Sequence, residues 1–128
     1  MSEIPEDLHY TNTHEWLEDQ GDGSYRVGIT DHAQEQLGDL VFVELPEIGS
    51  TYTAGAECAV VESVKSASDL YCPVDGEIVE VNADLEDSPE VVNTDPYGGG
   101  WIYRLKPTDP GSVDELLDAD GYAESLEE

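Results

Sequence analysis

Short runs of apolar residues alternate with turn signals along this chain, and that spacing is the strongest constraint on its fold. Runs such as "YRVGIT" and "EIVEVN" stand next to glycine-containing stretches such as "GDGS" and "VDG". Runs of this length and period are typical of β-strands. Several in succession, with few helical patterns between them, predict a mainly β fold built from antiparallel sheets.

Two segments predict short helices at the periphery of these sheets. "DHAQEQLG" and "SVDELLDA" each begin with the spacing of a capping box, Asp31 with Gln34 and Ser112 with Glu115. The second would be a C-terminal helix. Residues 83–100 predict a long loop with one helical turn.

The chain has 128 residues, a length that suits one domain spanning residues 1–128. Its formal net charge of −27 would repel nucleic acid and anionic membranes, so neither is an expected partner. A folded protein this acidic repels itself in dilute salt, and screening at high salt removes that repulsion. We therefore expect a salt-loving microbial host and a protein that is monomeric when free.

Several other classes of protein find no support in the sequence. The first residues, "MSEIPEDLHY", have neither the pattern of a signal peptide nor the arginines of a presequence, which predicts a cytoplasmic location. Cys58 and Cys72 are too few to staple the domain and predict two reduced thiols. We find no metal-ligand cluster, nucleophile motif or phosphate-binding loop, so we expect no enzyme.

Lys65 is one of two lysines in the chain, and it occupies a predicted bend between two strands. The residues that follow it, Ser66 to Ser68, are small and leave space around it. A tight bend would hold the lysine out into solvent. From position alone, an ordinary surface lysine near the acids Glu62 and Asp69 is the favoured interpretation, because an exposed lysine is the commonest kind.

The residues around this lysine closely resemble the lipoyl-lysine segment of the glycine cleavage system H protein family. The resemblance extends over nearly the whole chain, through "HEWL", "VGITDHAQEQLGD", "AVVESVKSASDLY", "PVDGEIVEVN" and "PYGGGWIYRLKP" in the family's order and spacing. It implies a lipoyl/biotinyl-type barrel-sandwich hybrid of antiparallel sheets. In that fold the modified lysine lies on a hairpin and the short helices lie at the periphery.

The resemblance also implies a function, which is that of a carrier and not of an enzyme. Lipoate would be joined to Lys65 by an amide bond. The arm would carry the aminomethyl group of glycine from a pyridoxal-phosphate glycine decarboxylase to a tetrahydrofolate-dependent aminomethyltransferase. A dihydrolipoyl dehydrogenase using FAD and NAD would then reoxidise it. A separate lipoate-attaching enzyme would modify the lysine.

Further site residues follow from matched positions in the family. Glu62 lies three residues before Lys65, where the family has a glutamate that the attaching enzyme would read. The positions that line the family's arm cleft correspond here to Thr13, Glu15, Ile29, His32 and Asp69. Some relatives have a histidine where this chain has Gln36, so that residue's role does not carry over.

Four alternatives remain open at this point. A biotinyl carrier places its lysine between methionines, whereas Lys65 lies between Val64 and Ser66. A lipoyl domain of another complex, or a protein that relays lipoate, would share the hairpin lysine. An interaction protein with an acidic decoy surface would leave that lysine unexplained.

Overall fold

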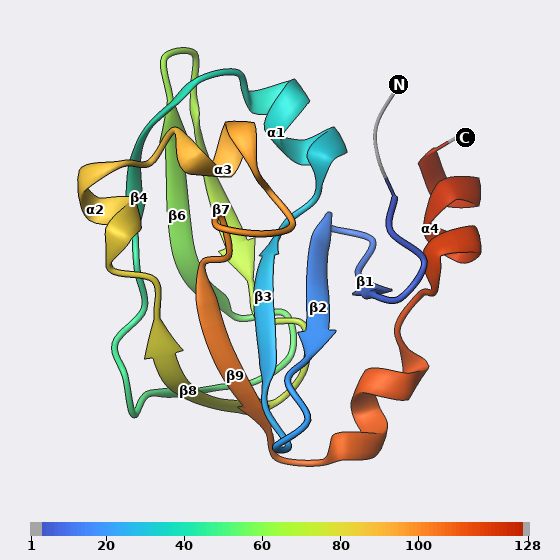
Figure 1. The fold of residues 1–128 in the computed structure, drawn as a ribbon. Helices are drawn as coiled ribbons and strands as arrows, with labels where there is room; N and C mark the ends of the chain where they lie inside the picture. The colour runs from blue at the N-terminus through green and yellow to red at the C-terminus, as the bar shows by residue number, and fades with distance from the viewer. Residues whose placement is uncertain (1–3, 127–128) are drawn as a thin grey trace.

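The computed structural model describes residues 4–126 as two antiparallel sheets with short helices around them (Figure 1). The larger sheet has the strand order β1-β2-β3-β9-β8-β5, and the smaller sheet has the order β4-β6-β7. The strands are β1 (His9–Tyr10), β2 (Glu15–Asp19), β3 (Tyr25–Ile29), β4 (Leu40–Glu44), β5 (Thr51–Tyr52), β6 (Glu57–Ser63), β7 (Ala67–Tyr71), β8 (Gly76–Val81) and β9 (Tyr103–Pro107). The predicted mainly β fold is confirmed. The predicted single domain includes residues 1–3 and 127–128, which lie outside the described residues.

Strands β6 and β7 form a hairpin that projects at one end of the molecule, next to helix α1 (Figure 1). β6 ends at Ser63 and β7 begins at Ala67, so three residues connect the two strands. β4 pairs with the other side of β6, with Leu40 opposite Ser63 and Glu44 opposite Val60. The bend is therefore supported on one side by the start of β4.

Helix α1 (Asp31–Leu37) lies within the predicted segment, but its cap is not the predicted one. The N-cap is Thr30, whose hydroxyl accepts a hydrogen bond from the Ala33 N–H at 3.2 Å. Asp31 is already inside the helix, so it cannot complete a capping box with Gln34. Thr30 takes the cap position because its buried hydroxyl, just after the end of β3, can also form a hydrogen bond within the protein interior. Gly38 ends the helix at φ +85°, a conformation that favours glycine.

A C-terminal helix exists, but the sequence pattern placed it too early. Residues Pro110–Glu115 form a 3-10 helix, η1, whose cap is Asp109 and not Ser112. The α-helix is α4 (Ala119–Leu126), where the Asp118 carboxylate accepts a hydrogen bond from the Gly121 N–H at 2.7 Å. The pattern failed because Asp109, whose carboxylate accepts a hydrogen bond from the Gly111 N–H at 3.0 Å, caps a turn three residues before Ser112. The predicted loop at 83–100 contains two short helices, α2 (Asp84–Asp87) and α3 (Val91–Thr94).

The core has two parts, and the smaller one joins α4 to the start of the chain. The main cluster fills the space between the sheets with residues such as Leu17, Val61 and Ile78. The smaller cluster contains Tyr10 and Tyr122, whose rings stack with centroids 4.8 Å apart. α4 is therefore held against β1, which precedes Glu15 in the chain. No helix within residues 4–126 is long and apolar enough to cross a membrane.

Candidate functional site

Lys65 is exposed on the three-residue bend between β6 and β7, and the bend is held together by Ser63. The Ser63 hydroxyl accepts hydrogen bonds from the backbone N–H groups of Lys65 and Ser66, each at 3.1 Å. The Val64 N–H donates to the Asp39 carbonyl at 3.1 Å and ties the bend to the start of β4. The lysine is therefore presented to solvent from a fixed backbone, as predicted from the sequence.

The Lys65 side chain lies against Gly38, the glycine that ends helix α1. A Cβ atom added to Gly38 would lie 3.1 Å from Lys65 Cε, so the bare glycine leaves the room that the lysine stem uses. Asn93 fixes this glycine: its amide donates to the Gly38 carbonyl at 2.8 Å and its side-chain oxygen accepts from the Leu40 N–H at 2.9 Å. The lysine stem thus lies at the C-terminal end of α1.

A cavity of about 350 Å³ opens between α1, the connection before β2 and strand β7. Four of the five residues predicted for the arm cleft line it: Thr13, Ile29, His32 and Asp69. Gln36 lines it too, at the position where some relatives have a histidine. We call this cavity the α1–β7 cleft. Its lining mixes apolar, hydroxyl, imidazole and carboxylate groups.

The distance between the lysine and this cleft suits a lipoyl arm. Asp69 follows Lys65 by four residues, which is about 13 Å along an extended strand. Lysine extended by a lipoyl group reaches about 14 Å from the backbone. An arm on Lys65 that follows α1 or β7 can therefore end inside the α1–β7 cleft.

Glu15 is the predicted cleft residue that does not line the cavity. The residue is 1% exposed, and its carboxylate lies behind Thr13. It accepts hydrogen bonds from the Thr13 hydroxyl and, at 2.6 Å, from the Thr11 hydroxyl. Burial raises the pKa of the Glu15 carboxyl, and the hydrogen bonds from the two threonines oppose that rise. Glu15 can act on a ligand in the cleft through the Thr13 hydroxyl.

His14 is a cleft residue that the sequence analysis missed. It lines the cavity and adopts φ +72°, which is uncommon for a residue other than glycine. Its Nδ1 lies 2.8 Å from the Tyr122 hydroxyl of α4, which in turn lies 2.7 Å from the Thr30 hydroxyl. Burial and the neighbouring His32 lower the pKa of the His14 imidazole. The "HEW" motif contains His14 and could have suggested it. Its unusual backbone conformation, however, cannot be recognised from the sequence.

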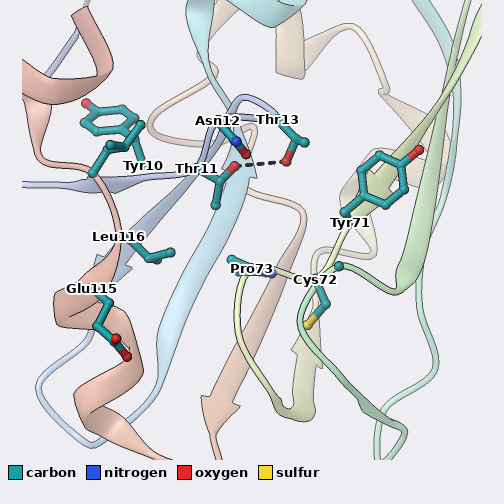
Figure 2. A pocket seen from close by; sticks show the side chains of 11 residues that line it. Tyr10, Thr11, Asn12, Thr13, Tyr71, Cys72, Pro73, Glu115 and Leu116 are labelled. Atoms are coloured by element: carbon teal, nitrogen blue, oxygen red, sulfur yellow. Dashed lines mark hydrogen bonds between the residues drawn. The ribbon is translucent and has the colours of Figure 1, made fainter. Parts of the chain in front are cut away.

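A second cavity of about 460 Å³ lies on the other side of Thr13 (Figure 2). Figure 2 shows the hydrogen bond between the Thr11 and Thr13 hydroxyls at the edge of this cavity. Cys72 and Glu115 lie across the cavity from each other on separate segments. Its lining contains none of the other predicted cleft residues. Both cysteines are free and buried, as expected from their small number. Although larger, this cavity meets β7 only at Tyr71, six residues after Lys65 and about 20 Å away along an extended strand, so the α1–β7 cleft is the better match to the arm.

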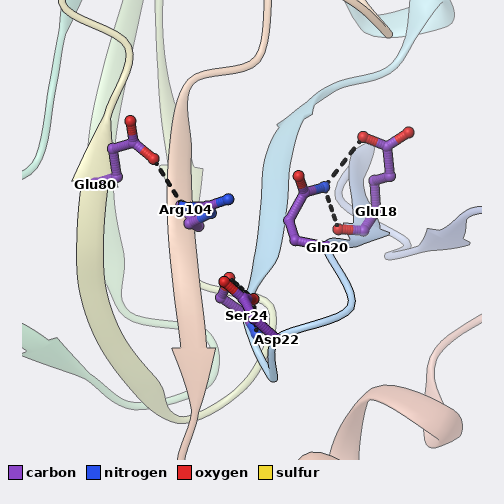
Figure 3. Close-up of polar contacts among 6 residues, drawn as sticks. All are labelled: Glu18, Gln20, Asp22, Ser24, Glu80 and Arg104. Atoms are coloured by element: carbon purple, nitrogen blue, oxygen red, sulfur yellow. Dashed lines mark hydrogen bonds and ion pairs between the residues drawn. The ribbon is translucent and has the colours of Figure 1, made fainter.

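Cationic side chains other than Lys65 lie on the six-stranded sheet. Arg104 pairs with Glu80 at 3.0 Å (Figure 3), and the Arg26 guanidinium lies 4.9 Å from the centre of the Trp101 ring. Figure 3 also shows the predicted turn after β2, in which Ser24 donates to Asp22. Lys65 is the one basic residue on the β4-β6-β7 sheet and its connecting bend.

A lysine on an exposed hairpin bend, one arm's length from a cleft, defines a carrier protein with a swinging prosthetic group. The comparisons with known proteins identify which carrier. The sequence matches the glycine cleavage H-protein family over residues 8–128. The chain therefore belongs to the glycine cleavage H-protein family.

Individual relatives and a solved structure agree with this. The chain is 62% identical to the glycine cleavage system H protein of Shewanella frigidimarina, covering 100% of this chain and 99% of that protein. It is 59% identical to that of Pectobacterium atrosepticum, covering 100% and 98%. A crystal structure of the H protein from Mycobacterium marinum superposes with a TM-score of 0.88 at 50% identity, covering 98% of this chain and 100% of that one.

Family membership confirms the expected function. The protein is a lipoyl carrier component of the glycine cleavage system and not itself an enzyme. The interpretations as a biotinyl carrier and as an acidic decoy are thereby set aside. The expected salt-loving host gains no support from these relatives. A strongly negative charge also raises solubility and prevents self-association, so it is no marker of origin by itself.

Proposed function

We propose that Lys65 is the lipoyl attachment site and that the α1–β7 cleft receives the loaded arm. The observation that carries this proposal is the placement of Lys65 on the exposed bend, with its stem against Gly38 and the cleft one arm's length away. When bound, lipoate supplies a dithiolane whose sulfur accepts and releases the aminomethyl group. The residues of this chain attach the arm, direct it and exclude water from its end.

The cleft residues suit a small cation at the end of the arm. An aminomethyl group bears an amine that is protonated near neutral pH. Asp69 lines the cavity, and Thr13 donates its hydroxyl proton to Glu15, which leaves the Thr13 oxygen able to accept. Charge-assisted hydrogen bonds of this kind are worth about 1.5–3 kcal/mol. Ile29 and Leu37 add apolar surface that limits access of water.

The individual partner enzymes follow from the same proposal. The loaded arm would move from a pyridoxal-phosphate glycine decarboxylase to a tetrahydrofolate-dependent aminomethyltransferase, and a dihydrolipoyl dehydrogenase with FAD and NAD would reoxidise it. A lipoate-attaching enzyme would modify Lys65 and read Glu62, which is exposed on β6 opposite Phe42. We further propose that residues 1–128 form one domain, monomeric when free, and that the protein works in the cytoplasm.

The test is to map the modification on protein treated with a purified lipoate-attaching enzyme. We expect the mass of one lipoyl group on the wild type, on the peptide containing Lys65. Lys65→Arg should take no lipoyl group and should melt within about 2 °C of the wild type, because exposed surface substitutions change stability little. Lys106→Arg, at the exposed lysine of β9, is the matched control and should be modified normally. Lipoyl on Lys106, or biotin on Lys65, would refute the assignment.

A further inference from the structure

The well-exposed large apolar side chains are unevenly distributed over residues 4–126. There are four of them, and three lie beside the lysine bend: Val41, Phe42 and Val64, which are 55%, 46% and 69% exposed. The fourth, Ile48 at 63%, follows the far end of β4. Isolated exposed apolar residues are ordinary, but a group of them next to a modified residue indicates contact with a partner.

A β-bulge creates this group. The register between β4 and β6 shifts between Leu40 and Phe42, which leaves Val41 without an opposite residue. In a regular strand, neighbouring side chains point to opposite faces, so one of Val41 and Phe42 would face the core. The bulge exposes both while Leu40 and Val43 stay buried. Exposing the chain's one phenylalanine to water costs free energy, which a partner that buries this side chain would recover.

Acidic residues accompany these apolar side chains. Phe42 and Glu62 lie directly opposite each other, so their side chains project from the same face of the sheet. The Val64 N–H donates a hydrogen bond to the carbonyl of Asp39, which is also exposed. We call the surface formed by Asp39, Val41, Phe42, Glu62 and Val64 the hairpin face. A complementary partner would present an apolar depression flanked by lysine or arginine.

The reach of the lysine side chain decides which partner must cover this surface. An unmodified lysine carries its Nζ only about 6 Å from its Cα, whereas the finished arm reaches about 14 Å. An enzyme that acylates the bare amine must bring its reacting centre to within that shorter distance of the bend. It therefore has to cover Val64, the residue before Lys65, and the neighbouring end of β4. Enzymes that use the finished arm can dock further away.

We propose that the hairpin face is the docking surface for the enzyme that acylates Lys65. The inference rests on the proposed function in taking Lys65 as the attachment site. In the step concerned, the neutral Lys65 amine attacks the carbonyl carbon of an activated lipoyl acyl donor bound to that enzyme. The amide C–N bond forms, the bond from that carbon to its leaving group breaks, and the leaving group departs with the electron pair. The amine proton passes to a base on the enzyme.

The test compares Phe42→Ser and Val64→Ser with Ile48→Ser, the matched control at an equally exposed site away from the bend. The unlipoylated proteins are titrated with a purified lipoate-attaching enzyme, lipoate and ATP. We expect the KM for the carrier to rise at least tenfold in the two hairpin-face variants and to stay within twofold in Ile48→Ser. The KM of the wild type should also rise with KCl. Fully lipoylated samples of all three variants should be reduced by dihydrolipoyl dehydrogenase and NADH at rates within about threefold of the wild type.

The outcomes separate this inference from the proposed function. A KM in Phe42→Ser and Val64→Ser equal to that of Ile48→Ser overturns the docking surface and leaves Lys65 as the attachment site. A wild type that takes no lipoyl group on Lys65 overturns both. If the wild type is dimeric by sedimentation and Phe42→Ser is monomeric with an unchanged KM, the face is a contact between two copies, and the proposal is wrong. Circular dichroism and melting temperature confirm that each variant is folded.

Discussion

At the scale of single residues, Glu15 shows how the site uses a carboxylate in an unusual environment. The chain has 31 acidic residues, most of which can face solvent. Within residues 4–126, Glu15 is an acidic residue that is buried. Burying a charge costs free energy unless hydrogen bonds offset it. The hydroxyls of Thr11 and Thr13 both donate to Glu15 and provide part of that compensation. The remaining cost appears as a raised pKa of the Glu15 carboxyl.

This predicts a pH-dependent stability difference between the wild type and Glu15→Gln. A raised pKa means that the folded state holds the proton more tightly than the unfolded state does. The associated stability is therefore fully present below the unfolded pKa, near 4.5, and is lost as the pH rises through the folded pKa. The glutamine cannot ionise. We expect its free energy of unfolding, relative to the wild type, to increase as the pH rises from 4 to 7.

Urea unfolding of both proteins at several pH values measures this slope. The amide adds unsatisfied donors and a pH-independent offset of about 1–3 kcal/mol, so the slope and not the absolute difference is the test. Glu18→Gln, at a half-buried position three residues further along β2, is the control for the loss of one carboxylate from the same strand. A difference between wild type and Glu15→Gln that is constant with pH contradicts the argument.

At the scale of secondary-structure elements, the α1–β7 cleft depends on a helix that does not line it. Tyr122 of α4 bonds to His14 and to Thr30, and Thr30 also caps α1. α4 thereby holds both the left-handed residue before β2 and the start of the helix that forms one cleft wall. Residues in such sparsely populated conformations persist where the surrounding structure determines them.

Tyr122→Phe should loosen the cleft without unfolding the protein. The substitution keeps the ring stack with Tyr10 but removes the hydroxyl that joins His14 to Thr30. We expect a loss of stability of about 1–3 kcal/mol, because the buried Thr30 hydroxyl and the half-buried His14 ring lose a partner. We also expect faster release of ammonia from the lipoylated protein loaded with an aminomethyl group. In that reaction water cleaves the group to formaldehyde and ammonia and leaves the thiol.

Ammonia release from the purified loaded protein, without the transferase, is the measurement. Tyr10→Phe is the matched control, since it alters the other ring of the same stack and its hydroxyl bonds only to the Pro5 carbonyl within the described residues. Equal release rates for Tyr122→Phe and Tyr10→Phe would show that α4 acts on stability alone.

At the scale of the whole molecule, the net charge of −27 acts on both stability and association. The screening length falls from about 10 Å at 0.1 M salt to about 3 Å at 1 M. We expect the melting temperature to rise with KCl up to the molar range as self-repulsion is screened. A gain of 1 kcal/mol corresponds to roughly 4 °C for a domain of this size.

Differential scanning calorimetry in KCl and in sorbitol of matched osmolality separates screening from a general solute effect. A melting temperature that rises equally in both solutes would attribute the change to exclusion of solute from the surface and not to charge. This physical effect is independent of the host, whose expected salt-loving character the relatives do not support.

The sequence predicted the strands and the lysine bend well because both depend on local patterns. Alternating apolar residues specify strands, and the small residues after Lys65 specify an open bend. Thr13, Ile29, His32 and Asp69 came from a resemblance, and they line one cavity although they are far apart in the chain. The C-terminal helix was predicted but placed too early, because Gly121 interrupts the helical pattern of α4, which is held by the packing of Tyr122 against Tyr10. His14 was missed because its conformation is set by that same packing.

The order in which the chain is made gives the bracing by α4 a further consequence. The lysine hairpin is complete once residues 57–71 have emerged and β4 is in place, whereas α4 follows at residues 119–126. With Lys65 as the proposed attachment site, a nascent or truncated chain that lacks α4 would still offer its lysine for acylation, but His14 and Thr30 would have no Tyr122 to hold them. Such a molecule would accept the prosthetic group and yet release its cargo into water. The ability to be modified and the ability to protect the cargo are therefore acquired at different times, from different segments of one polypeptide.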